Sequence, residues 1–259
     1  MGRTSTAAGN ILPAAVVVRS MKIEIWSDIA CPWCYIGKRR FEAALAEFPH
    51  REDVEVLWRS FQLDPDIPEH FEGNELEYLS QRKGMPVERV QQMLEHVTEQ
   101  AAGEGLTFRY DDLVVANSFP AHQLIHLAGT HGKADGAKES LLAAHFEQGR
   151  NIADVETLVE LGTALGLGLE DAEIRQTLQS GRHADDVRAD IAEAGALGVN
   201  GVPFFVLDRK YGISGAQPVE VFTNALNEAW KESHPLVMAN AEGGNDTDSG
   251  VCGPDGCTT

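Results

Sequence analysis

Cysteine is scarce in this chain, which has only four among its 259 residues. They form two close pairs, Cys31 with Cys34 near one end and Cys252 with Cys257 near the other. In a reducing compartment, close pairs of this kind are more often catalytic or metal-binding than structural. The cysteine count therefore directs attention to the chemistry of the two pairs.

Basic residues are also few. The chain has 21 lysines and arginines against 40 aspartates and glutamates, a formal net charge of -19. Binding to a phosphate backbone needs clustered lysine and arginine side chains, and the sequence shows no basic stripe. We therefore predict no nucleic-acid partner, and we interpret the acidity as a well-solvated surface.

No long apolar run is present, and none approaches the ~20 residues that a membrane-spanning helix needs. The short apolar run 11–18 is broken by Pro13 and closed by Arg19, and Arg3 is the one basic residue before it. We interpret residues 1–20 as a disordered N-terminal extension rather than an export signal. The sequence thus predicts a cytoplasmic protein with no membrane association.

Cys31-Pro32-Trp33-Cys34 lies between an alternating segment at 22–27 and an amphipathic segment at 32–48. This order predicts a strand, a tight turn and a helix whose first turn carries both thiols. Free backbone N–H groups and the helix dipole stabilise a thiolate there. We expect Cys31, nearest the helix end, to be unusually acidic and open to solvent. A thiolate with a second thiol in reach is suited to thiol–disulfide exchange.

Hydrophobic periodicity predicts the other elements. A second strand at 54–61 completes a β-α-β unit, so its two strands should be parallel. Two further strands, expected to be antiparallel, fall at 202–208 and 211–215, and a last helix falls at 218–232. The intervening part of the chain shows no strand pattern, and its expected helices are 74–83, 86–102, 118–129, 134–148, 154–165, 170–180 and 184–196.

The predicted order gives an α/β protein with a β-α-β half, a large all-helical insertion and a β-β-α half. The domain boundaries are expected as follows: a first part at 21–73, the inserted helical domain at 74–197, a second part at 198–235, and a flexible acidic tail with a Cys-x4-Cys pair at 236–259.

Three segments carry a resemblance to a known family: Trp26 to Cys34, Asn117 to His122, and Gly201 to Phe205. Together with a Cys-x-x-Cys turn and a helical insertion, they resemble the thioredoxin fold of the DsbA group. Within that group the chain is most similar to FrnE-type oxidoreductases, relatives of the kappa glutathione transferases and the 2-hydroxychromene-2-carboxylate isomerases. The resemblance covers residues 21–235.

The resemblance implies a thiol–disulfide oxidoreductase or protein disulfide isomerase. Cys31 should attack a substrate disulfide, and Cys34 should resolve the mixed disulfide. The family places a cis proline opposite the dithiol turn, and Pro203 fits that position. Val202 would then present its backbone to an extended substrate. Pro32 and Trp33 are expected to border the substrate and to make the dithiol less oxidising than DsbA, which carries His where Trp33 stands.

The second cysteine pair is less constrained by the sequence. The intervening Gly253, Pro254 and Gly256 are compatible with a turn that closes a small disulfide loop. We predict that Cys252 and Cys257 form a secondary redox pair that exchanges electrons with the first. The alternative is a tail disulfide or metal-scavenging pair without catalytic consequence.

His122 and His126 have the i, i+4 spacing of some metal sites. The residue after the first histidine is Gln123, which cannot serve as the base of a metalloprotease. We therefore predict no metal site and interpret the two histidines as packed on a helix face. In the related isomerases this segment lines the substrate pocket, which makes Asn117 and His122 candidate pocket residues.

The sequence thus predicts an enzyme that exchanges disulfides with protein or peptide substrates as a monomer or a dimer. It requires no cofactor, because the cysteines carry the electrons, and glutathione is a candidate co-substrate. One alternative is a glutathione-dependent isomerase or transferase of the kappa type, which would bind glutathione tightly without disulfide exchange. Another is a chaperone-like binding module, whose activity would survive Cys31→Ser.

Overall fold

The computed structural model of the chain describes residues 20–68, 71–234, 251–253 and 256–258. Its central sheet has the strand order β2-β1-β3-β4. β1 (Met21–Ser27) and β2 (Val54–Ser60) are parallel, as predicted, and β3 (Phe204–Leu207) is antiparallel to both β1 and β4 (Tyr211–Ser214). The β1-α1-β2 unit therefore provides the parallel half of the sheet.

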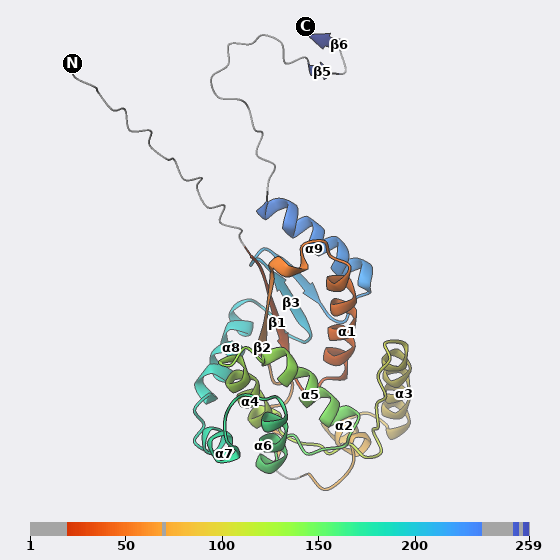
Figure 1. The fold of residues 1–259 in the computed structure, drawn as a ribbon. Helices are drawn as coiled ribbons and strands as arrows, with labels where there is room; N and C mark the ends of the chain where they lie inside the picture. The colour runs from red at the N-terminus through yellow and green to blue at the C-terminus, as the bar shows by residue number, and fades with distance from the viewer. Residues whose placement is uncertain (1–19, 69–70, 235–250, 254–255, 259) are drawn as a thin grey trace, which may run out of the picture.

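Helices α1 (Pro32–Ala46) and α9 (Val219–Ser233) pack on one face of this sheet (Figure 1). Their contact is aromatic: the ring of Phe41 lies 5.5 Å from that of Phe205 and 5.9 Å from that of Phe222. Burying such rings supplies much of the stability of a core. This face fixes the position of α1, the helix that begins at the dithiol.

The remaining helices of the described part lie in sequence between β2 and β3, and Figure 1 shows most of them gathered at one end of the sheet. Their bounds are α2 (Glu75–Lys83), α3 (Val87–Gly103), α4 (Phe119–Gly129), α5 (Ala134–Phe146), α6 (Val155–Ala164), α7 (Asp171–Gln179) and α8 (Ala184–Ala196). Every helix predicted from periodicity is present, with ends shifted by at most two residues. The core is continuous from the strands into these helices.

Helix α1 ends at Ala46, two residues before the predicted end. Pro49 follows, and a proline disfavours helical backbone at the residue before it. Strand β3 begins at Phe204 rather than at residue 202, because Val202 and Pro203 belong to the loop that precedes the strand. Both differences arise at prolines, where periodicity carries no information on the boundary.

Helix α8 covers the other face of the sheet, where Trp26 packs with Ala194, Val199 and Val206. Trp26 Nε1 donates a hydrogen bond of 2.9 Å to the carbonyl of Asp190. The Asp190 carboxylate in turn accepts from the backbone N–H of Ser60 at 2.9 Å. The last helix before β3 is thereby fixed to both parallel strands.

Helix α5 is joined to α1 by ion pairs around Glu139. Its carboxylate accepts hydrogen bonds from Tyr35 at 2.8 Å and from Arg39 at 2.9 Å, and it lies 2.9 Å from Lys38 Nζ. Burial alone would raise the pKa of Glu139, but the hydrogen bond from Arg39 and the charge of Lys38 outweigh burial and lower it to about 2. This cluster couples the helical insertion to the dithiol helix.

Replacing Glu139 by glutamine should therefore destabilise the protein by about 1–2 kcal/mol at neutral pH, allowing for partial exposure of the carboxylate. A lowered folded-state pKa contributes stability above the unfolded value, and that stability is lost as the pH falls toward 2. Chemical denaturation at pH 7 and pH 3 should show a difference that shrinks in acid. Glu156→Gln, which breaks an exposed pair with Arg175, is the control and should change little at either pH. An equal loss for Glu139→Gln at both pH values would contradict this account.

The C-terminal cysteines lie on two short strands, β5 (Val251–Gly253) and β6 (Gly256–Thr258), which pair in antiparallel fashion. Cys252 and Cys257 are opposite each other in its register. The sequence pattern indicated only a turn here, so the two strands are a correction. Of the predicted extension at 1–20, residues 1–19 lie outside the described residues, and so do residues 236–250, 254–255 and 259 of the predicted tail at 236–259.

Candidate functional site

The two thiols lie where β1 meets α1. Cys31 is the N-cap residue of α1, Pro32 occupies the first turn, and the N–H of Cys34 donates to the carbonyl of Cys31 at 3.0 Å. Proline suits this position because its missing N–H would have no partner there. Both thiols are free. The sequence thus predicted correctly that one thiol begins the helix and the other lies one turn further on.

The expectation that Cys31 is open to solvent is wrong for this structure. Its exposed fraction is 3%, and that of Cys34 is 1%. The loop before β3 covers the turn, and Cys31 Sγ donates a hydrogen bond to the carbonyl of Val202 at 3.5 Å. Sequence periodicity gave no sign of this cover, because Val202 is 171 residues away along the chain.

The expectation that Cys31 is unusually acidic is also corrected. The hydrogen bond to Cys34 and burial raise the pKa of the Cys31 thiol well above its ordinary value, and the negative charge of Asp28 adds to this. Burial alone would raise the pKa of Cys34 too, but the hydrogen bond from Cys31 and the charge of Lys138 outweigh burial and lower it. Of the two thiols, Cys34 is therefore the more acidic.

Pro203 is buried directly against the dithiol helix. The Val202–Pro203 peptide bond is cis, as the resemblance implied. Gly37 of α1 faces the proline ring, and a Cβ added at Gly37 would lie 2.9 Å from Pro203 Cγ. The absence of a side chain at Gly37 therefore allows the loop before β3 to approach the helix.

Gly37→Ala should destabilise the protein by about 1–3 kcal/mol, because the new methyl group forces the Pro203 ring away from α1. Gly195→Ala is the matched control, since Gly195 is also helical and a Cβ there meets nothing within 4 Å. That change should leave stability equal or raise it by up to ~1 kcal/mol. Thermal denaturation of both variants measures the difference in stability. If Gly37→Ala were as stable as the unmodified protein, the loop at Pro203 would not need to lie this close to α1.

Pro32 and Trp33 are half-buried, so part of each side chain faces solvent beside the thiols. The indole ring of Trp33 lies 6.3 Å from the imidazole of His96 on α3. Helix α3 of the insertion therefore borders the turn. Of the predicted substrate-contacting residues, Pro32 and Trp33 lie in the dithiol turn, the Val202 carbonyl contacts Cys31, and Pro203 is buried against α1. Their contact with a substrate stays a prediction.

A buried acid lies immediately before the dithiol, and the sequence analysis assigned it no role. Asp28 is 1% exposed and accepts hydrogen bonds from the N–H groups of Leu63 at 2.8 Å and Ala30 at 3.3 Å. His122 Nε2 lies 3.4 Å from its Oδ1. Burial alone would raise the pKa of Asp28, but the hydrogen bond and charge of His122 outweigh it and lower the pKa. The sequence signal that could have identified Asp28 was an aspartate directly after an apolar strand.

His122 thus belongs to the site, though not in the predicted way. His122 contacts Asp28. Burial lowers the pKa of His122, although the hydrogen bond to Asp28 and its charge act in the opposite direction. His126, one turn further on, pairs with a different carboxylate, that of Asp190, at 3.1 Å. Within the described residues, no group of three or more His, Cys, Asp or Glu side chains is arranged to hold a metal ion. The two histidines are therefore divided between two polar clusters.

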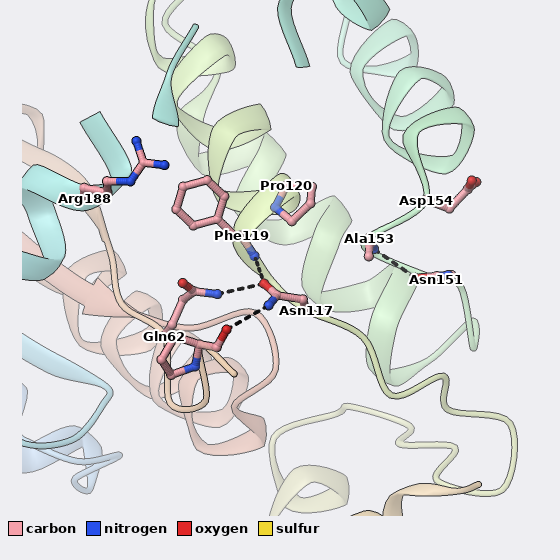
Figure 2. A pocket seen from close by; sticks show the side chains of 9 residues that line it. Gln62, Asn117, Phe119, Pro120, Asn151, Ala153, Asp154 and Arg188 are labelled. Carbon is pink, nitrogen blue, oxygen red and sulfur yellow. Dashed lines mark hydrogen bonds between the residues drawn. The ribbon is translucent and has the colours of Figure 1, made fainter. Parts of the chain in front are cut away.

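Asn117 lines a pocket of about 650 Å³ together with Gln62, Phe119 and Arg188 (Figure 2). Its carboxamide accepts from Gln62 Nε2 and from the N–H of Phe119, each at 2.9 Å. It also donates to the carbonyls of Pro65 and Ile67 at 3.2 and 3.3 Å. With its hydrogen-bonding groups occupied, Asn117 joins the loop after β2 to the start of α4. The pocket lining does not include the dithiol.

Lys138 of α5 is the second charged group that the sequence analysis overlooked. It is 1% exposed, and its Nζ donates to the carbonyl of Ser27 at 3.3 Å. The Ser27 hydroxyl is buried without a hydrogen-bond partner. A lysine in an amphipathic helix pattern normally indicates an exposed position, so the sequence carried no signal for it.

Residues 22–227 match the family described as DSBA-like thioredoxin domain. A probable DsbA oxidoreductase from Streptomyces coelicolor is 47% identical, with a TM-score of 0.77, over 92% of this chain and 99% of that one. An uncharacterised Bacillus subtilis protein, YwbO, is 26% identical over 82% of this chain and 99% of its own length.

Two more distant structures share the fold. The cytosolic disulfide reductase DsbM from Pseudomonas aeruginosa is 20% identical with a TM-score of 0.57, over 82% of this chain and 99% of that one. A 2-hydroxychromene-2-carboxylate isomerase is 14% identical with a TM-score of 0.60, over 82% and 97%. These likenesses concern the arrangement of strands and helices. Among the described residues, no helix is both long and apolar enough to cross a bilayer.

Proposed function

The chain belongs to the DSBA-like thioredoxin domain family, and from that premise we propose that it catalyses thiol–disulfide exchange on protein or peptide substrates. The observation that carries the proposal is the pair of free thiols at the N-cap and first turn of α1. Two thiols one helical turn apart can close into a disulfide as a substrate disulfide opens.

Cys31 is the attacking sulfur in this proposal. It occupies the helix N-cap, next to the half-exposed Pro32 and Trp33, whereas Cys34 lies one turn deeper. When a substrate displaces the Val202 carbonyl from Cys31, the Cys31 thiol gives up its proton to solvent and the thiolate attacks. A bond forms between Cys31 and one substrate sulfur as the substrate disulfide breaks, and the other substrate sulfur leaves with the electron pair and takes up a proton from solvent.

Cys34 then attacks Cys31 Sγ and releases the second substrate sulfur. The dithiol loses two electrons and becomes a disulfide, and the substrate disulfide is reduced to two thiols. No prosthetic group is needed, because the two sulfur atoms carry both electrons. Run backwards, the same steps transfer a disulfide to a reduced substrate.

We favour the reducing direction. Strong oxidants of this family owe their potential to a stabilised dithiol form. Here the charge of Asp28 and the bond to Cys34 oppose a thiolate at Cys31, and Trp33 cannot donate to one as an imidazole can. DsbM, a fold relative, is described as a cytosolic disulfide reductase. A reductant in the cytoplasm is therefore our preferred role.

The reduction potential tests that direction. Equilibration with glutathione redox buffers should give a value nearer the ~-270 mV of thioredoxin than the ~-120 mV of DsbA. Alkylation of the remaining thiols and mass analysis measure the oxidised fraction at each ratio. A value at or above ~-120 mV would reverse the proposed direction while leaving the exchange chemistry intact.

Glutathione is the reductant that we propose for recycling the Cys31–Cys34 disulfide. A DsbM structure contains GSH, which supports a tripeptide thiol as a ligand of this fold. Two glutathione molecules would give up two electrons and leave as glutathione disulfide. Tight binding of glutathione without any disulfide exchange would instead favour a transferase or isomerase of the kappa type.

The direct test of the proposed function is mechanism-based trapping. Cys34→Ser removes the resolving sulfur, so Cys31 should remain joined to its substrate. Incubation with a disulfide-bonded peptide should yield an adduct that dithiothreitol releases, detected by intact-mass measurement. Cys31→Ser/Cys34→Ser is the control and should form none. Absence of an adduct with Cys34→Ser, together with no insulin reduction by the unmodified chain, would refute the function.

A further inference from the structure

Lys138 stands out because it is buried without a carboxylate partner. Its side chain is 1% exposed, and among the described residues it forms no ion pair within 4 Å. Lys38 of α1, equally buried, provides the contrast: it lies within 4 Å of Glu42, Asp135 and Glu139. An ammonium group removed from water without an anion is costly. The position of Lys138 therefore calls for an explanation beyond packing.

The contacts of Lys138 lead toward the second cysteine. Its Nζ donates to the carbonyl of Ser27 at 3.3 Å and lies 5.6 Å from the centre of the Trp58 ring. Ser27 is the last residue of β1, directly before the segment that leads into the dithiol turn, and its hydroxyl is buried without a hydrogen-bond partner. Lys138 of α5 is thus bound to the end of β1, from which the chain enters the turn that carries both thiols, and its charge acts on Cys34.

The charges around Lys138 support this reading. Burial lowers the pKa of Lys138 to about 8. Negative charge on Cys34, and then on Asp28 and Cys31, acts against burial and raises this pKa. The positive charge of Lys38 lowers the pKa of Lys138 further. His122 of α4 feels the positive charge of Lys138, and His145 of α5 is buried and kept neutral. The groups that hold a proton on Lys138 are therefore chiefly those at the dithiol.

We propose that Lys138 is a positioning residue for the resolving step, in which its ammonium group holds the sulfur of Cys34 as a thiolate. The inference rests on the proposed function and goes beyond it, because it assigns the control of the second thiol to the helical insertion. In the mixed disulfide, Cys31 can no longer donate a hydrogen bond to Cys34. The positive charge of Lys138 is then the charge that favours an anion on Cys34.

The step balances without any further reactant. The Cys34 thiolate attacks Cys31 Sγ, a Cys31–Cys34 bond forms, and the bond from Cys31 to the substrate sulfur breaks. The departing substrate sulfur takes the electron pair and a proton from solvent, which replaces the proton that Cys34 lost on ionising. The dithiol is oxidised by two electrons, and the substrate is reduced by two.

The variant Lys138→Met tests the proposal, since it preserves the apolar stem and removes the charge. A preformed mixed disulfide of Cys31 should resolve about 10- to 100-fold more slowly at pH 7, and the rate should need a higher pH to reach its plateau. Lys138→Arg should restore the rate because it restores the cation. Lys38→Met, which removes the other buried lysine beside Trp58, should leave the pH midpoint of resolution unchanged.

Two further measurements separate this inference from the proposed function and from a folding defect. Formation of the mixed disulfide by Cys34→Ser should be the same within about threefold when Lys138→Met is added, because the lysine acts on the other sulfur. In the unmodified protein with ¹³C-labelled lysine, the titration midpoint of Lys138 should fall when the dithiol is oxidised, because the anion on Cys34 is lost. An unshifted midpoint, or normal resolution in a folded Lys138→Met, would overturn the inference even if exchange itself persists.

Discussion

Replacing Cys31 by serine should lower the rate of insulin reduction by about a thousandfold or more, because a hydroxyl cannot form the covalent intermediate. Serine is nearly isosteric with cysteine, so the buried turn should keep its shape. Stability measured by chemical denaturation should change little. The loss should therefore appear in the rate alone, measured as turbidity from the released insulin chains.

Cys34→Ser is the matched control for that experiment, since it removes a thiol from the same turn. It should also lose turnover, but it should retain the first step and accumulate the mixed disulfide. The comparison is informative because the two thiols differ in acidity, with the pKa of Cys31 raised and that of Cys34 lowered. If Cys31→Ser, rather than Cys34→Ser, captured the substrate, the assignment of the attacking sulfur would have to be reversed.

Replacing Asp28 should give the largest loss of stability among the site residues, about 3–5 kcal/mol for Asp28→Ala at neutral pH. The change would leave the N–H groups of Leu63 and Ala30 and the ring of His122 without their buried acceptor. An unsatisfied buried group costs its full desolvation. Urea denaturation at pH 7 measures the loss.

The pH dependence follows from the direction of the Asp28 shift. Its folded-state pKa is lowered, so its contribution is present above the pKa of the unfolded chain and is lost as the pH falls below it. The penalty of Asp28→Asn should accordingly shrink in acid. A penalty that stays constant from pH 7 to pH 3 would show that the charge of Asp28 plays no part.

The same substitution should change the dithiol. The negative charge of Asp28 contributes to the raised pKa of Cys31, so Asp28→Asn should make that thiol more acidic and speed its alkylation by iodoacetamide. Asp190→Asn is the control, because Asp190 is equally buried but accepts from Ser60 and pairs with His126 and Arg59 on the other face. It should destabilise the protein and leave Cys31 reactivity unchanged.

Several features of the site could be predicted from the sequence because they depend on residues close together along the chain. The turn from Ile25 through Cys34 contains a strand pattern, a helix-entry proline and two thiols one helical turn apart. The positions of the helices in the insertion followed from their 3.6-residue period. The tail cysteines lie opposite each other in the register of β5 and β6, and their role as a secondary redox pair stays a prediction.

Periodicity failed wherever partners came from distant segments. Nothing in the local pattern showed that the loop at Val202 covers Cys31, that His122 meets Asp28, or that the charge of a buried lysine of α5 acts on Cys34. Burial and neighbouring charges decide the acidity of a thiol, and for Cys31 they oppose the effect of the helix N-terminus. An N-cap location alone therefore predicted the wrong exposure and the wrong direction of the pKa.

The sequence by itself determined the order of the elements, the place of the dithiol at the start of a helix, and the family. Those properties follow from local periodicity, proline and the spacing of thiols, which neighbouring residues specify. Only the tertiary structure decided which charges surround each sulfur, because α4, α5 and the loop before β3 meet at the turn only after folding. Coulomb interactions and desolvation act through space, so the electrostatics of the site belong to the folded chain.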